Sequence, residues 1–401
     1  MFQQYRAVFR APGSAAFCAA AFVMRIPIAM YPIGLVLLLS IRTGHYGTGG
    51  LLSGAYTFGA AVGMPIVGRV MDRIGQGRVL LPAVGVHVVA AACLVTLAQS
   101  HVGTGWWFVP VVVIGFAYPA VGSLSRARWS YVLAGTPELS TAYSLESVLD
   151  EVIFVVGPII ASVLATQVDP LWVIVLAAVF VALGAAWLRT LRETEPPVQE
   201  HGDEPHRSAL AIPGMALLVV TMIGMGGIFA SVEVVMAAFA GQHDERSSTG
   251  LVLACFALGS GLSGLFYGAR QWHTPVAIRY WLHALVFAAL IPLLLVAGSV
   301  DVLYAIAVVV GLGIAPTLIT GFGMVEQLMP ARGLTEGLAW VTTGLNVGYG
   351  SLAAVVGAIA DRHGAHNAFY VSVGAGVFVA TGTTVLLLSL RRVHRQPVVP
   401  G

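Results

Sequence analysis

Long apolar segments separated by short polar ones form the main pattern of this chain. Between Arg78 and Arg126 there is no Asp, Glu, Lys or Arg, and a polar turn at 100–105 divides this stretch in two. A membrane-spanning helix needs about 20 apolar residues, so the stretch predicts two spans joined by a tight turn. The same pattern along the whole chain predicts twelve spans, at 14–41, 48–68, 79–99, 106–125, 140–166, 170–188, 212–240, 248–269, 278–298, 302–325, 334–359 and 366–390.

The composition restricts the class of protein. Of the 401 residues, 58% are hydrophobic and 9% are charged, whereas soluble domains carry about 25% charged residues. This excludes a soluble enzyme, a nucleic-acid-binding protein and a disordered chain. The apolar segments are too long for a membrane β-barrel, whose strands alternate over about ten residues. The sequence therefore predicts an all-α membrane protein with twelve transmembrane helices.

No motif points to catalysis or to a bound metal or cofactor. The sequence has no phosphate-binding loop, no zinc-ligand spacing and no Ser-His-Asp arrangement above chance. The three cysteines, Cys18, Cys93 and Cys255, all lie in apolar segments and are expected to be small buried side chains. We therefore expect a protein that is not an enzyme, with no cofactor and no metal. The first apolar segment is too long for a cleavable signal peptide and reads as the first span.

Arginine placement predicts the orientation. With a cytoplasmic N-terminus, sixteen of the 20 basic residues fall on the cytoplasmic side and three (Arg42, Arg246 and Arg362) on the outer side, with Arg25 inside the first span. Cytoplasmic loops carry an excess of Lys and Arg, so we expect both termini in the cytoplasm of a bacterial cell, with the chain in the inner membrane. Trp129 then falls at the inner interface, where aromatic belts form.

A polar segment divides the chain into two sets of six spans. Residues 192–208 include two prolines and several acids, which is typical of a flexible cytoplasmic linker. We expect an N-terminal six-helix bundle at 1–190, a linker at 191–211 and a C-terminal six-helix bundle at 212–401. The halves resemble each other at an offset of 200 residues: Gly50, Gly59 and Gly68 match Gly250, Gly259 and Gly268. The sequence thus predicts two pseudo-symmetric bundles, an arrangement that places a substrate site near the membrane midplane between repeats.

The loop between the second and third spans carries a distinctive run of residues. It reads Gly68-Arg69-Val70-Met71-Asp72-Arg73-Ile74-Gly75-Gln76-Gly77-Arg78, and its glycines permit a tight reversal. An acid at this face of the membrane can also interact with a nearby helix N-terminus, such as the one expected near Leu334.

These residues resemble the signature loop of the major facilitator superfamily, G-x-x-x-D-R-x-G-x-x-R/K. Gly68, Asp72, Arg73, Gly75 and Arg78 fill its positions, and the twelve spans and central linker extend the resemblance to the whole chain. The resemblance implies that this loop acts as a cytoplasmic latch between the halves in the outward-open state. It further implies that Asp72 docks near the start of the eleventh span.

The second copy of that loop departs from the pattern, because Trp272 and His273 stand 200 residues after Asp72 and Arg73. One latch, in the first half, is expected.

The fifth span partly resembles the antiporter motif of the same superfamily. Gly157-Pro158 is present, whereas Ser144 and Ile153 replace upstream glycines. The resemblance favours an exporter similar to drug/proton antiporters. The fourth-span arginine of proton-coupled members looks absent, since Arg126 and its neighbour Arg128 fall at the cytoplasmic end.

Four charged residues are predicted to lie within the membrane at similar depths. Arg25 is near the middle of the first span, and Glu146, Asp150 and Glu151 lie in the fifth span. A buried arginine needs a partner, so we expect an ion pair of Arg25 with Asp150 or Glu151, with Glu146 nearer to water. The pair could be purely structural. Alternatively, an acid left without a cation could take up and release a proton, and Glu151 or Asp150 is the first choice for that role.

Other polar residues within spans have two interpretations each. Glu233, the only charge of the seventh span, is either an interfacial residue or a ligand in an outer vestibule. Asn346, in the eleventh span, either joins helices or binds substrate. His87 and His283 lie in spans that the resemblance makes peripheral, where packing is the favoured role over a proton relay.

Together these features predict a secondary transporter. The leading hypothesis is proton-driven efflux of a small amphipathic molecule by alternating access, and the alternative is proton-coupled import of a polar nutrient such as a sugar or an organic acid. Its expected partners are the small-molecule substrate, protons and the lipid bilayer, and we expect a monomer that binds no nucleic acid.

Overall fold

The computed structural model describes residues 6–100, 102–136, 138–197, 209–270, 272–329 and 334–393. Within these residues, twelve helical segments are long and apolar enough to cross a membrane, from Ser14–Thr43 at the start to Ala365–Arg391 at the end. The predicted number of spans and the all-α fold class are confirmed. Hydrophobic stretches of this length form helices in a membrane because every backbone N–H and C=O then bonds within its own segment.

The chain folds into two compact units. Unit 1 comprises residues 1–44 and 52–203, and unit 2 comprises residues 45–51 and 204–401. The main boundary falls inside the predicted linker. The short segment 45–51 is the beginning of helix α4 (Tyr46–Ile74), so this helix starts in unit 2 and continues in unit 1.

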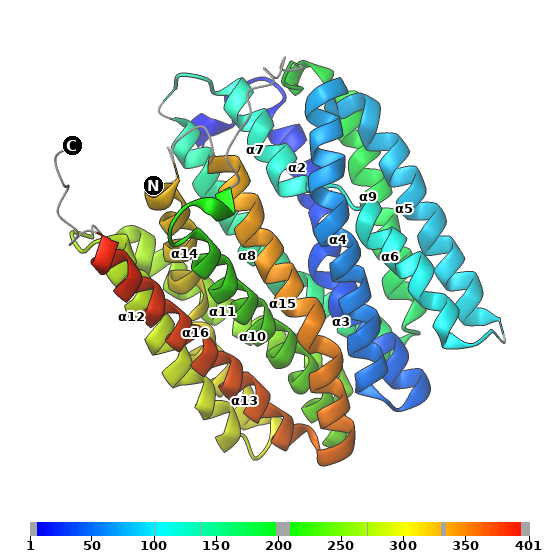
Figure 1. Cartoon of the computed structure of the whole chain (residues 1–401). Helices are drawn as coiled ribbons and strands as arrows, with labels where there is room; N and C mark the ends of the chain where they lie inside the picture. The colour runs from blue at the N-terminus through cyan, green and yellow to red at the C-terminus, as the bar shows by residue number, and fades with distance from the viewer. Residues whose placement is uncertain are drawn as a thin grey trace. The chain divides into compact units, whose positions relative to one another are not determined.

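Unit 1 is built from helices that form six spans. Helix α2 packs on α9, α3 on α8, and α5 lies beside both α6 and α9 (Figure 1). Besides α4, its elements are α2 (Ser14–Arg25), α3 (Pro27–Thr43), α5 (Gln76–Gln99), η1 (Thr104–Trp107), α6 (Phe108–Ala117), α7 (Val121–Val132), α8 (Glu138–Gln167), α9 (Leu171–Thr190) and η2 (Arg192–Thr194).

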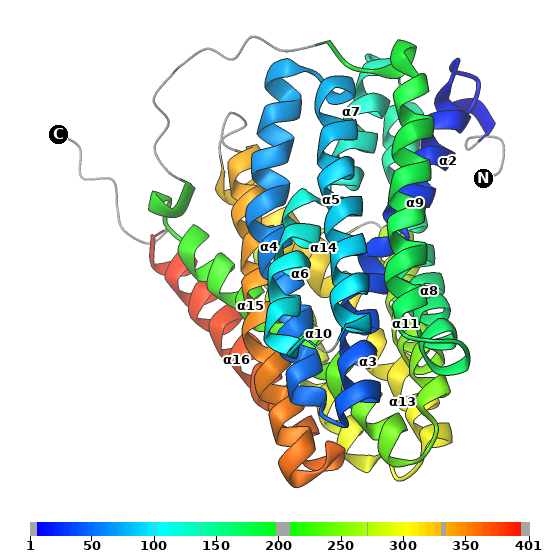
Figure 2. The same cartoon turned by 90° about the vertical axis from the view of Figure 1, so that its right-hand side faces the viewer.

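Unit 2 has the same number of spans after the linker. Its long helix α10 packs against α15 and α16, which themselves run side by side (Figure 2). Its elements are η3 (Ala209–Ala211), α10 (Met215–Gln242), η4 (Arg246–Ser248), α11 (Thr249–Ala269), α12 (Val276–Leu290), η5 (Ile291–Val296), α13 (Val300–Gly311), α14 (Ile314–Leu328), α15 (Leu334–His363) and α16 (Ala365–Val393).

The first and fourth spans are interrupted, and their interruptions meet. Pro27 has no N–H to continue the helix, so α2 ends at Arg25 and α3 begins at Pro27. The fourth span changes from α6 to α7 around Tyr118. The Tyr118 hydroxyl donates a hydrogen bond to the Met24 carbonyl at 2.9 Å. One interruption thus donates a hydrogen bond to the backbone of the other.

The glycine repeat has a structural counterpart in each unit. A Cβ atom added to Gly59 would collide with the Val112 carbonyl of α6, and one added to Gly259 would collide with the Val308 carbonyl of α13. Both glycines therefore allow the second helix of their half to pack directly on the backbone of the fourth. This shared contact supports the interpretation of the two halves as copies.

The start of the predicted linker packs on unit 1. Thr194 is buried, and the Arg128 side chain donates hydrogen bonds to the Leu191 carbonyl at 2.8 Å and to the Thr194 hydroxyl at 2.7 Å. Glu195 accepts a hydrogen bond from the Gly77 N–H at 2.7 Å. These contacts hold residues 191–195 against α7 and the beginning of α5, so the segment expected to be flexible is structured over its first residues. Residues 198–208 lie outside the described part.

Candidate functional site

Arg25 lies at the end of α2, directly before the proline break. Its Nη2 is 2.6 Å from Glu146 Oε2, and its Nη1 is 2.7 Å from Asp150 Oδ1. Glu146 and Asp150 are one turn apart on α8 and therefore share a face. The structure thus joins Arg25 to two acids at once, one of which, Asp150, is among the partners expected from the sequence. Glu151, the other expected partner, is the next residue of α8 and is half-buried.

Glu146 is the most enclosed member of this group. Its side chain is completely buried, and its Oε1 accepts hydrogen bonds at 2.7 Å from the Ser125 hydroxyl and from the Trp129 indole N–H. The expectation that Glu146 would lie near water is wrong. Trp129 is also misplaced by the sequence pattern, because it is buried against Phe17 instead of standing at an interface. A hydrogen-bonding role for Trp129 has no signature in the sequence, since it depends on how α7 packs on α8.

Asp150 joins a second arginine to the group. Its Oδ2 is 3.0 Å from Arg126 Nη2, and both side chains are partly exposed. Gly122, one turn before Arg126, leaves room for both arginines: a Cβ there would lie 3.1 Å from Arg126 Nη1 and 4.0 Å from Arg25 Cζ. Arg126, which the sequence places at the end of the fourth span, thus pairs with an acid of the fifth span. Two acids and two arginines form a connected network of balanced charge, which we call the unit 1 charge network (Arg25, Arg126, Glu146 and Asp150).

Gly157 helps to place the acids of this network. It lies two turns after Asp150 on α8, and a Cβ there would approach the Ala29 side chain to 2.7 Å and the Ile26 carbonyl to 3.3 Å. The Gly157-Pro158 pair therefore lets α8 pack closely on the start of α3, next to the break that holds Arg25. This is the structural setting of the partial antiporter motif.

Unit 2 contains one acid within its seventh span, Glu233 on α10. The Tyr349 side chain of α15 lies within hydrogen-bonding reach of this carboxylate. Glu233 Oε1 is buried and has no hydrogen-bond partner in the described structure. Asn346 is half-buried on α15, one turn before Tyr349. A residue predicted to lie in the outer third of its span is therefore close to the middle of a neighbouring helix, where an acid and a phenol meet.

Close packing of α10 on α15 positions Glu233. A Cβ on Gly226 would collide with the Leu345 carbonyl, and one on Gly348 would collide with the Ile223 carbonyl. The two backbones can approach so closely only because both positions are glycine, as is common where membrane helices associate. Gly348 is adjacent to Tyr349, so this crossing brings the phenol to α10.

The signature loop is described only in part. Gly75 has a positive φ of 97° and ends α4 before the reversal into α5, which explains the need for glycine there. Arg73 and Arg78 are exposed, and Gly68 has open space around its Cα. The side chain of Asp72 lies outside the described residues, as does that of Leu334. The docking of Asp72 therefore stays a prediction.

His87 is a buried side chain with a hydrogen-bond partner on each ring nitrogen. The Ile114 carbonyl can only accept, so His87 Nδ1 carries the proton of that 3.0 Å hydrogen bond, and Nε2 accepts from the Tyr31 hydroxyl at 2.7 Å. Both ring nitrogens are satisfied, in agreement with a packing role. Among the described residues, no group of three His, Cys, Asp or Glu side chains could hold a metal ion.

Comparison with known proteins identifies the family. A family model described as Major Facilitator Superfamily matches residues 15–270. No curated protein matches the sequence. Among solved structures, the chain is similar to the nucleoside transporter NupG, with 13% identity, coverage of 94% of this chain and 99% of that chain, and a TM-score of 0.67. It is also similar to a POT family transporter in complex with 5-aminolevulinic acid (12% identity, 96% and 97% coverage, TM-score 0.69) and to the human organic anion transporter MFSD10 (15% identity, 93% and 100% coverage, TM-score 0.64).

Proposed function

The chain belongs to the major facilitator superfamily of secondary transporters, and we propose that it exports a small amphipathic molecule in exchange for protons. Transporters of this kind expose their substrate site alternately to the two sides by movement of one half against the other. The chain is a transporter of a small-molecule substrate in a membrane. Our proposal concerns the direction of transport, the coupling ion and the substrate class.

Glu233 is the observation that carries the proposal. A carboxylate at membrane depth is costly unless a cation or several hydrogen bonds compensate its charge. Among the described residues, Tyr349 lies within hydrogen-bonding reach of Glu233, while Glu233 Oε1 is buried without a hydrogen-bond partner. Such an acid can lose its charge by binding a proton and regain it where water reaches the site. That cycle is what coupling of transport to a proton gradient requires.

The unit 1 charge network is less suited to that task in the arrangement described. Each of its acids is an acceptor for an arginine, and Glu146 has two further hydrogen-bond donors. Protonating either acid would leave the two arginines with a single carboxylate between them. We therefore assign proton exchange to Glu233 in place of the first choice from the sequence, and propose that the unit 1 charge network holds the break in the first span together.

Import of an anionic nutrient would use Arg25 as a substrate ligand. Both terminal nitrogens of Arg25 are bonded to acids of the same unit, which disfavours that role. Export is supported by the partial antiporter motif around Gly157-Pro158. The direction of transport is decided by experiment.

The test uses purified protein in liposomes that contain a pH-sensitive dye. Apolar organic cations and neutral drugs are added under an imposed pH gradient, with sugars and organic acids as the comparison set. We expect the amphipathic compounds to accelerate proton movement through the wild type, and Glu233→Gln to abolish this acceleration. Asp301→Asn removes an exposed acid of the same unit and is expected to leave the acceleration unchanged.

Two results would overturn the proposal. Acceleration by sugars or organic acids but not by amphipathic compounds would favour import of a polar nutrient. Full coupling in Glu233→Gln would remove Glu233 as the site of proton exchange, provided that the variant is as well folded as Asp301→Asn.

A further inference from the structure

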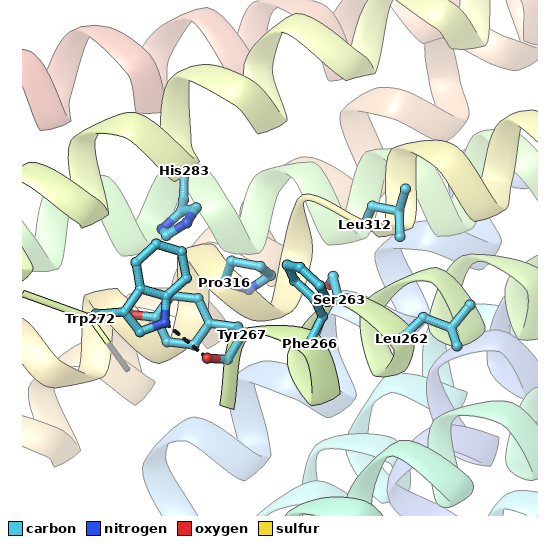
Figure 3. Close-up of a pocket in the computed structure, with 8 residues that line it drawn as sticks. All are labelled: Leu262, Ser263, Phe266, Tyr267, Trp272, His283, Leu312 and Pro316. Atoms are coloured by element: carbon cyan, nitrogen blue, oxygen red, sulfur yellow. Dashed lines mark hydrogen bonds between the residues drawn. The ribbon is translucent and has the colours of Figure 1, made fainter. Parts of the chain in front are cut away.

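The loop after α11 replaces the signature motif with an aromatic cluster. Trp272 stacks on Tyr267 with ring centres 4.8 Å apart, and its indole N–H donates to the Tyr267 carbonyl at 2.9 Å. His283 of α12 meets both rings edge-on, at 5.3 Å and 5.9 Å (Figure 3). The second half thus departs from the signature at Trp272 because this residue anchors a packed group of rings at the end of the eighth span.

Two arginines lie over these rings. The guanidinium of Arg270 is 4.9 Å from the centre of the Trp272 ring, and that of Arg279 is 5.7 Å from the centre of the Tyr267 ring. Arg279 also donates to the Tyr267 hydroxyl. In the described structure neither arginine is within ion-pair distance of a carboxylate, and both Arg279 Nε and His283 Nδ1 are buried without a hydrogen-bond partner. Within the described part of the chain, the cluster therefore presents two positive charges that no carboxylate pairs with.

A pocket of about 300 Å³ begins beside this cluster. Figure 3 shows Leu262 and Leu312 at the end away from Trp272, with Phe266 and Pro316 between them. Leu312 lies where the tenth span is interrupted between α13 and α14, well inside the membrane. The pocket thus leads from the aromatic cluster, over whose rings the two arginines lie, to apolar side chains midway along the tenth span. Its full lining is Leu262, Ser263, Phe266, Tyr267, Trp272, His283, Leu312 and Pro316.

We propose that this pocket binds an anionic phospholipid. The phosphate lies between Arg270 and Arg279, and one acyl chain lies along Phe266 towards Leu312. Basic pockets between spans are suited to anionic head groups, and the two arginines would repel a cation from the rings. The apolar inner part of the pocket favours a lipid over free phosphate, which has nothing to place there. This site lies entirely within unit 2 and does not depend on the proposed transport function.

The test measures retained lipid by native mass spectrometry of the purified protein. Detergent-solubilised protein is titrated with phosphatidylglycerol and, separately, with phosphatidylcholine. We expect phosphatidylglycerol to bind more tightly to the wild type, and removal of each arginine to weaken it about fivefold, or roughly 30-fold in Arg270→Gln/Arg279→Gln. Leu312→Trp keeps both charges but fills the pocket, and is expected to weaken binding as well. Arg10→Gln/Arg192→Gln, two exposed arginines of unit 1, is the matched control and should bind as the wild type does.

Each contrary result is decisive. Equal affinity for the two lipids, or unchanged phosphatidylglycerol binding in Arg270→Gln/Arg279→Gln, would overturn the proposal. Unchanged binding in Leu312→Trp, or displacement of the lipid by millimolar inorganic phosphate, would show a simple anion site without an acyl pocket. Because the variants change partly exposed side chains, their monodispersity in size-exclusion chromatography serves as the check on folding.

Discussion

The first and seventh spans occupy equivalent positions in the two halves but handle charge in different ways. At an offset of 200 residues, Ile26-Pro27 corresponds to Gly226-Gly227. In the first span the proline interrupts the helix, and Arg25 at the break is neutralised by acids of α8. In the seventh span the glycines leave α10 continuous and allow α15 to pack closely, while the one partner that the described residues offer Glu233 is Tyr349. The first span thus has a charge at a helix break that neighbouring acids compensate. The seventh span has an acid on a continuous helix without a cationic partner among the described residues.

Among the changes that test this comparison, removal of Arg25 should reduce the stability of the protein most. Arg25→Met leaves the fully buried Glu146 without its counter-ion, and loss of one partner of a buried pair costs about 3–5 kcal/mol. We expect a large fall in the midpoint temperature of unfolding of the purified protein in detergent. The double variant Arg25→Met/Glu146→Gln should recover much of that stability, because it removes the unpaired charge as well.

Failure of the double variant to recover stability would contradict the role of charge compensation. A matched comparison is Glu233→Gln in unit 2. It neutralises an acid that lacks a cation, so it should leave the unfolding temperature unchanged or raise it.

The second change tests the close glycine contact between α10 and α15. On α10 this contact lies at the position that corresponds to the break in the first span. Gly348→Leu would place a side chain against the Ile223 carbonyl, so α15 would have to move away from α10. Overpacking of this kind costs about 1–3 kcal/mol, and displacement of Tyr349 should also impair proton coupling. Gly374→Leu on α16, where nothing lies within 4 Å of an added Cβ, is the control and should be neutral by thermal unfolding. Normal stability and coupling in Gly348→Leu would show that the close approach is dispensable.

The sequence predicted the spans well because their determinants are local. Twelve apolar segments of sufficient length, with charges at their ends, specify twelve helices whatever their packing. The candidate site was predicted only in part. Depth counting brought Arg25 to the level of α8, but it could not give the rotation of α8, which decides that Glu146 faces Arg25 and is buried. Arg126 and Trp129 were read as residues of a span end because their roles come from the packing of α7 on α8, which leaves no periodic signal.

The break in the first span provides the third prediction. Tyr118→Phe removes the hydroxyl that donates to the Met24 carbonyl, so this buried carbonyl loses that hydrogen bond. An unsatisfied buried acceptor costs about 1–3 kcal/mol. Thermal unfolding should therefore show a loss smaller than that of Arg25→Met. Tyr280→Phe removes a buried hydroxyl of unit 2 that bonds to Thr221, a side chain with an alternative acceptor at Leu218. It is expected to be milder, and a larger effect than that of Tyr118→Phe would argue against a special role for the break.

The smallest effect on stability is expected at Asp72. The resemblance assigns this residue to a latch that forms in one conformational state, so its side chain contributes to the cycle more than to the folded state of its unit. Asp72→Asn keeps the size of the side chain and removes the charge that would interact with a helix N-terminus, worth about 0.3–1 kcal/mol. We expect transport in liposomes to slow by roughly two- to fivefold, with expression and the unfolding temperature unchanged. Arg78→Gln in the same loop tests whether charge in general matters there. Undiminished transport by Asp72→Asn would contradict the assignment of a latch to unit 1. Arg25 and its acids would then be the charged residues of that half with an assigned role.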